Sequence, residues 1–146
     1  PYKAPEKPVR EDVIFEKIKV EKDKLTVLIA EDNAGNFKLF ETILKNDYTI
    51  VHAWNGKEAV ELFKEYEPHI VLMDINMPEM NGYEATKEIR KLSEVIPIIA
   101  VTAYAFASDE EQVMNSGFDA YASKPLNASA LKKQMVDLLR ARVFVI

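Results

Sequence analysis

Short apolar runs alternate along the chain with longer segments in which apolar residues recur every three or four positions. The apolar runs fall at 25–30, 48–53, 70–73, 96–101 and 118–122. The periodic segments contain the stripes Phe37/Phe40/Leu44, Ala59/Leu62/Phe63/Tyr66, Ala85/Ile89/Leu92, a weaker one near 105–115, and Leu131/Met135/Leu138/Leu139. Runs of about four to eight apolar residues are typical of buried strands, and a period near 3.6 is typical of helices with one buried face. We therefore predict five strands, each followed by a helix.

This alternation of strands and helices restricts the fold. Successive βα units build a parallel sheet with helices on both of its faces. Crossovers between parallel strands are right-handed, which leaves few topologies. Asn33 and Asn55 each precede a predicted helix, and asparagine is a favoured helix N-cap. We therefore predict an α/β fold with a doubly wound, five-stranded parallel sheet in the strand order 2-1-3-4-5.

The first 24 residues differ in composition from the rest of the chain. Pro1, Pro5 and Pro8 lie among Lys, Glu and Arg residues, which is typical of a solvated linker. Residues 13–20 are more apolar, but the stretch is too short to distinguish a strand from a helical turn. We predict a linker at 1–24 and one domain at 25–146. Because the first residue is Pro1 rather than Met, we expect a fragment of a longer protein or a processed chain.

Composition excludes several classes of protein. The 146 residues suit one domain, and a hydrophobic share of 48% argues against a disordered chain. A net charge of −5 without a long basic block argues against a nucleic-acid surface. The absence of cysteine excludes disulfides, thiolate metal sites and a cysteine nucleophile. No apolar run approaches the roughly 18 residues of a membrane helix, so we expect no membrane contact and a cytoplasmic location.

Polar and charged residues stand where the predicted strands end. Asp74 closes the run at 70–73, and Glu31 with Asp32 follows the first strand. The last two strands lead to Thr102 and Lys124. A charge at the end of a hydrophobic strand costs free energy unless it is paired, metal-bound or used. Ligands of open α/β sheets bind at the carboxyl ends of the strands, so we predict that these groups form one site.

Simpler interpretations compete with a functional one. Two adjacent acids before a helix would by themselves be read as favourable charges at its N-terminus, but Asp74 and Lys124 make that reading insufficient. We interpret His52 and His69 as structural or surface residues away from these strand ends. We expect four aromatic residues to be core or near-core: Phe37, Phe40, Trp54 and Phe63.

Four short motifs occur in order, each at the end of its own strand: Glu31-Asp32, Met73-Asp74 with Met77-Pro78, Thr102-Ala103 and Lys124-Pro125. Over residues 25–140 the chain resembles the receiver domain of two-component response regulators. The resemblance implies a flavodoxin-like or CheY-like fold. It also implies a phosphoacceptor that takes a phosphoryl group from a phosphohistidine, in a kinase dimerisation domain or a histidine phosphotransfer domain.

The resemblance assigns Asp74 as the phosphoacceptor and implies Mg²⁺ as the cofactor. Asp32 and Asp74 would bind the ion directly, Glu31 through a water, and Asn76 through its main-chain carbonyl. This set agrees with the preference of Mg²⁺ for oxygen ligands. A phosphoryl transfer step needs groups that position the reactants and neutralise charge.

The same resemblance assigns roles to residues of the later strands. Lys124 would pair with Asp74 at rest and with a phosphoryl oxygen afterwards, through a cis peptide bond to Pro125. The Thr102 hydroxyl and the Ala103 N–H would donate to the other phosphoryl oxygens. Tyr121 would change rotamer together with Thr102 and switch a face built from the helix near 105–115, the strand at 118–122 and the last helix. Residues 104–106 would belong to that face.

Three other functions are weighed against the receiver. A haloacid-dehalogenase-type phosphatase would need an acid two residues after its nucleophile, where this chain has Asn76. A flavodoxin-like electron carrier would place its phosphate at Glu31 and Asp32, which would repel it. A receiver that only docks is disfavoured because the phosphorylation set is complete. We expect the receiver of a hybrid sensor histidine kinase, with a free-standing single-domain regulator as the alternative.

Overall fold

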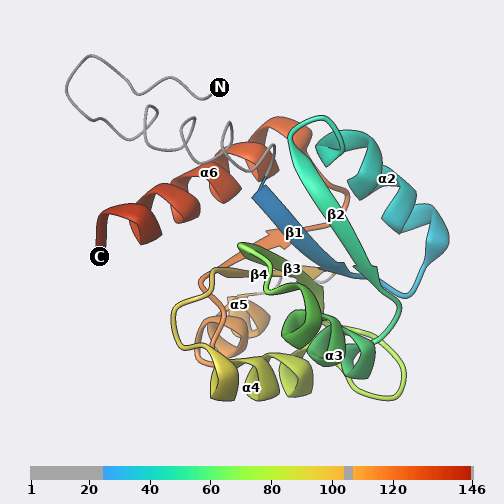
Figure 1. Cartoon of the computed structure of the whole chain (residues 1–146). Coiled ribbons are helices and arrows are strands. Elements are labelled where there is room, and N and C mark those ends of the chain that lie inside the picture. Colours follow the sequence, from blue (N-terminus) through green and yellow to red (C-terminus); the bar gives the residue numbers. More distant parts are fainter. Residues whose placement is uncertain (1–24, 104–106, 146) are drawn as a thin grey trace, which may run out of the picture.

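The computed structural model describes residues 25–103 and 107–145, so the predicted linker at 1–24 and residues 104–106 of the predicted switching face lie outside the described residues. The strands are β1 (Leu25–Ala30), β2 (Tyr48–Ala53), β3 (Ile70–Asp74), β4 (Ile98–Thr102) and β5 (Ala120–Ser123). The helices are α2 (Ala34–Leu44), α3 (Gly56–Tyr66), α4 (Gly82–Leu92), α5 (Ala107–Met114) and α6 (Ala128–Val145). Figure 1 shows their arrangement.

The five strands form one parallel sheet in the order β2-β1-β3-β4-β5, which confirms the predicted topology. Helices α2 and α6 lie on one face of the sheet, and α3, α4 and α5 lie on the other (Figure 1). The chain reverses its direction of winding at β1, so β1 and β3 are neighbours in the sheet. Their carboxyl ends therefore border the crevice where ligands of such sheets bind.

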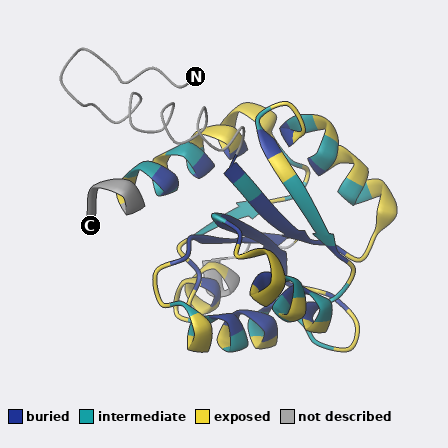
Figure 2. Ribbon diagram, viewed as in Figure 1, coloured by how far each residue is buried: buried dark blue, intermediate teal, exposed yellow. Residues whose placement is uncertain are grey.

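The core consists of two apolar layers, one on each face of the sheet. All residues of β3 and β4 are buried, as expected for central strands covered on both sides. Figure 2 shows buried strands between helices whose outer faces are exposed. Leu131, Met135 and Leu139 of α6 are buried in one layer, as their helical spacing predicted. No helix in the described ranges is long and apolar enough to cross a membrane.

Asparagine caps begin four of the described helices, and the cap of α6 is Asn127, whose side chain accepts a hydrogen bond from Ala130 N. The Asn33 and Asn55 side chains accept hydrogen bonds from Asn36 N and Glu58 N, which confirms both predicted N-caps. A third cap, at Asn81, forms a reciprocal capping box with Glu84. That cap begins α4 directly after the loop that follows Asp74.

The structure corrects several details of the sequence interpretation. The fourth strand begins at Ile98 rather than residue 96, because Pro97 has no N–H for the ladder. The fifth covers 120–123 rather than 118–122. Trp54 was expected in or near the core but is 47% exposed, since it lies in the connection after edge strand β2 rather than in the sheet.

Candidate functional site

The groups predicted to form one site come together at the carboxyl edge of the sheet. Asp74 is the last residue of β3 and lies beside Val101 of β4. Glu31 and Asp32 follow β1, and Lys124 follows β5. Lys124 N donates to the carbonyl of Thr102, the last residue of β4. Parallel strands that end at one level thus gather residues from distant parts of the chain.

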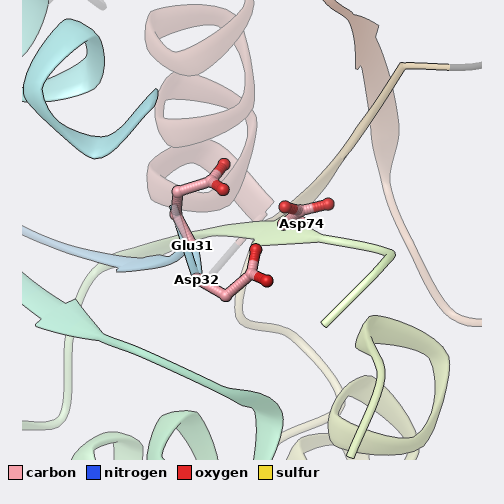
Figure 3. A group of neighbouring side chains, drawn as sticks. All are labelled: Glu31, Asp32 and Asp74. Carbon is pink, nitrogen blue, oxygen red and sulfur yellow. The ribbon is translucent and has the colours of Figure 1, made fainter. Parts of the chain in front are cut away.

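Three carboxylates form the centre of this site. Glu31, Asp32 and Asp74 each offer one oxygen, and these oxygens all lie within 4.8 Å of one another. Figure 3 shows the three side chains beside one another at the ends of β1 and β3. Glu31 and Asp74 are buried, whereas Asp32 is exposed. Carboxylates at this spacing repel one another, and a bound divalent cation relieves the repulsion. The donor set fits Mg²⁺.

Lys124 provides the positive charge next to the buried acids. Its Nζ lies 3.1 Å from Glu31 Oε1 and 3.4 Å from Asp74 Oδ2. Asp74 was expected as the resting partner, but the longer Glu31 side chain makes the shorter contact. Burial acts to lower the pKa of Lys124, but the carboxylates of Asp74 and Glu31 outweigh it, so that pKa is raised. The ammonium therefore stays charged at neutral pH.

Asp74 is an unusual carboxyl group because of its surroundings. Burial and then the charge of Glu31 raise its pKa, while Lys124 and the Asn76 N–H lower it, and the net result is a pKa of about 6. Asn76 N donates to Asp74 Oδ1 at 3.1 Å. Both oxygens of Asp74 therefore have partners, one from the following loop and one from Lys124.

The remaining predicted residues occupy different environments. Thr102 is buried at the end of β4, and Ala103 after it is exposed. The Lys124–Pro125 peptide bond is cis. Tyr121 is half-buried and packs against the apolar layer on the α3–α5 face. Its carbonyl accepts a hydrogen bond from Gln134 Nε2 of α6, which ties β5 to the last helix.

Two glycines that sequence reasoning missed hold the loop that carries Asn76. A Cβ on Gly56 would lie 2.1 Å from the Met80 carbonyl oxygen, to which Gly56 N donates at 3.0 Å. A Cβ on Gly82 would lie 2.4 Å from the Asp74 carbonyl oxygen. Only glycine permits these close approaches. The pairs Asn55-Gly56 and Asn81-Gly82 in the sequence were a signal of tight backbone at both places.

His52 also belongs to the surroundings of the site, so its assignment away from the strand ends was wrong. Its Nε2 lies 2.9 Å from the main-chain oxygen of Glu31. In the sequence, the available signal was that His52 is the second-last residue of the second strand and therefore lies near its carboxyl end. His69 lies at the opposite edge of the sheet, where its Nδ1 accepts a hydrogen bond from Thr26 N. That contact supports the structural interpretation of His69.

Comparisons with known proteins agree with this geometry. Residues 27–136 match the family model described as the response regulator receiver domain. A polar-differentiation response regulator DivK from Brucella anthropi is 43% identical over 105 residues, which cover 70% of this chain and 85% of the relative.

Solved structures show the same fold. The receiver domain of a sensor histidine kinase from Pseudomonas aeruginosa PAO1, described with magnesium coordinated in the active site cleft, has a TM-score of 0.74 and 30% identity; the match covers 80% of this chain and 98% of that one. The receiver domain of Ssk1 from Saccharomyces cerevisiae, solved with the histidine phosphotransfer protein Ypd1, has a TM-score of 0.73 and 32% identity, covering 79% and 88%.

These matches leave no support for the phosphatase or the electron carrier. The family match covers β1 from Val27 onward, the other four strands in full, and the whole constellation from Glu31 to Lys124. The chain therefore belongs to the family of response regulator receiver domains and is part of a two-component phosphorelay.

Proposed function

We propose that Asp74 of this chain accepts a phosphoryl group from a phosphohistidine in a Mg²⁺-dependent reaction. The observation that carries the proposal is the cluster of Glu31, Asp32 and Asp74 within 4.8 Å, with the Lys124 ammonium against it. This combination supplies a nucleophile, oxygen ligands for a cation and a fixed positive charge at one strand end. Those are the parts that phosphoryl transfer requires.

The transfer conserves atoms and charge in a simple way. A carboxylate oxygen of Asp74 attacks phosphorus, and an O–P bond forms while the N–P bond of the phosphohistidine breaks. The bonding electron pair returns to the imidazole nitrogen of the donor, and Asp74 becomes an acyl phosphate. Because only the ionised carboxylate attacks, the pKa of about 6 leaves Asp74 reactive at neutral pH and above.

The acids of the site would hold the cation. Asp32 and Asp74 are the proposed direct ligands, together with the carbonyl of Asn76, and Glu31 acts through a water. When bound, Mg²⁺ neutralises charge on the carboxylates and on the phosphoryl oxygens. Glu31 is fully buried and already contacts Lys124. These contacts favour an indirect role for its carboxylate, through a water, over direct binding of the cation.

Residues in and directly after β4 and β5 would bind the oxygens of the phosphoryl group on Asp74 and report its presence. We assign Lys124, the Thr102 hydroxyl and the Ala103 N–H as donors to its oxygens. Thr102 and Tyr121 are the proposed switch residues. The switched surface comprises α5, β5 and α6, and the hydrogen bond from Gln134 to the Tyr121 carbonyl links two of these elements.

The donor would be the phosphohistidine of a kinase dimerisation domain or of a histidine phosphotransfer domain. The Ssk1 receiver, solved with Ypd1, supports the second type. For the parent protein we propose a hybrid sensor histidine kinase, which the likeness to a sensor histidine kinase receiver supports. The DivK relatives, of which this chain covers 85%, favour a free-standing regulator instead. The genomic sequence upstream of Pro1 decides between them.

The phosphoacceptor role is tested by intact mass spectrometry. The protein is incubated with acetyl phosphate or phosphoramidate, with Mg²⁺ or with EDTA. We expect one phosphoryl adduct that requires Mg²⁺ and is lost in Asp74→Asn. Asp137→Asn on the surface of α6 is the matched control and should retain the adduct. An adduct that persists in Asp74→Asn, or no adduct with any donor, would refute the proposal.

A further inference from the structure

The side chain of His52 contacts the main chain of the acidic segment from the neighbouring strand. In the β1–β2 register, His52 lies opposite Ile29, two residues before Glu31. Its Nε2 is 2.9 Å from the Glu31 carbonyl oxygen, and because a carbonyl only accepts, Nε2 carries the hydrogen. Glu31 N donates to the Ala53 carbonyl at 3.0 Å. Strand β2 therefore holds both main-chain groups of Glu31.

Two aromatic side chains fix the orientation of the His52 ring. The Phe37 ring of α2 stacks on it, with the ring centroids 3.6 Å apart and the planes 1° from parallel. The Trp54 ring lies 4.2 Å away at an angle of 43°. Contacts between flat rings favour such defined geometries. The direction of the Nε2–H bond is thus set by packing on α2 and at the end of β2.

The hydrogen bond from His52 acts on the peptide that leads into Asp32. The carbonyl of Glu31 and the nitrogen of Asp32 belong to one planar peptide unit. A donor that fixes this carbonyl therefore also fixes the bond from which Asp32 departs. The Asp32 carboxylate is the exposed member of the acid cluster, so its position depends strongly on its own backbone.

We propose that His52 is a positioning residue for the cation site, acting through the Glu31–Asp32 peptide. The inference rests on the proposed function, because it concerns the ligand Asp32. Groups that orient metal ligands through a hydrogen bond commonly change metal affinity when they are removed. The stacked ring also contributes to packing, so the test has to separate these two contributions.

Three substitutions at this position separate the hydrogen bond from the ring. His52→Phe keeps the stacked ring but has no N–H to donate. His52→Gln and His52→Asn both lose the ring, but the longer glutamine places its amide nitrogen near the position of Nε2, whereas asparagine is too short. Mg²⁺ affinity is measured from ¹H–¹⁵N shift titrations of the Glu31 and Asp32 amides, and stability from urea unfolding.

We expect the three variants to rank differently in Mg²⁺ affinity and in stability. The Kd for Mg²⁺ should be roughly tenfold higher than that of the wild type in His52→Phe and His52→Asn. In His52→Gln it should be close to the wild-type value. Stability should fall in both His52→Gln and His52→Asn and be best retained in His52→Phe. A role in packing alone cannot produce this crossing pattern. Equal Kd values in all four proteins, or Kd values that follow stability, would overturn the inference.

The same titrations distinguish this inference from the proposed function. If the wild type binds Mg²⁺ and Asp32→Asn abolishes binding, the cation site stands. Equal affinity across the His52 variants would then refute the positioning role alone. If the wild type itself shows no saturable shift with Mg²⁺, the proposed function fails, and the inference fails with it.

Discussion

Replacing Asp74 with Asn should stabilise the protein without Mg²⁺ and abolish phosphorylation. The Asp74 side chain is buried beside Glu31, and its pKa rises from an ordinary 3.8 to about 6. A raised carboxyl pKa means that the folded state binds this proton more tightly than the unfolded state does. Ionised Asp74 therefore opposes folding above about pH 6, and the opposition disappears as the pH falls below about 4.

The size of the effect follows from the pKa shift. Each pKa unit corresponds to about 1.4 kcal/mol, so a rise from 3.8 to about 6 makes the ionised form about 3 kcal/mol less favourable in the folded state. Asparagine has the size and neutrality of the protonated carboxyl. We expect Asp74→Asn to gain about 2–3 kcal/mol of unfolding free energy at pH 8, and close to nothing at pH 4.

Urea unfolding followed by circular dichroism at pH 8, 6 and 4, in EDTA, measures this gain. Asp137→Asn, an exposed substitution of the same type on α6, is the control and should show little pH-dependent change. Added Mg²⁺ should stabilise the wild type, because a ligand of the folded state raises its stability, and should have less effect on Asp74→Asn. A variant that is less stable than wild type at pH 8, or equally altered at all three pH values, would refute the reasoning.

Three further predictions concern single contacts. Lys124→Met leaves Glu31 and Asp74 without their cation, so unfolding free energy at pH 8 should fall by about 3 kcal/mol and recover in part below pH 6; a loss independent of pH would contradict this. Gly56→Ala places a carbon 2.1 Å from the Met80 oxygen and should lower the unfolding free energy in urea by about 2 kcal/mol. Unchanged stability would contradict this, because it would mean that the loop containing Met80 can move aside at no cost. Arg90→Met loses bonds to the Gly117 and Ile96 carbonyls and to Asp119, which should cost about 2 kcal/mol. The Arg90→Met variant should keep the wild-type Kd for Mg²⁺, because these contacts lie at the edge of the sheet opposite the acid cluster. A higher Kd in this variant would contradict the prediction.

Local signals were sufficient for the architecture. Apolar runs and helical stripes identified the five strands and their helices, because burial of one face imposes a period that nearby residues alone express. The caps at Asn33 and Asn55 were predictable for the same reason, since a cap bonds to the backbone three residues on. Strand starts at residues 98 and 120 were misplaced by two residues, because the ladder rather than apolarity determines where pairing begins.

Local sequence patterns were enough to predict the order of strands and helices and the presence of acids, a hydroxyl and an ammonium at strand ends. Which of these groups touch one another depends on how the strands are paired in the folded protein. Lys124 is 93 residues from Glu31 in the chain, yet it makes its shorter contact there. His52 reaches the Glu31 carbonyl from another strand. Such contacts depend on strand register and side-chain length together, so they cannot be predicted from the pattern of neighbouring residues in the sequence.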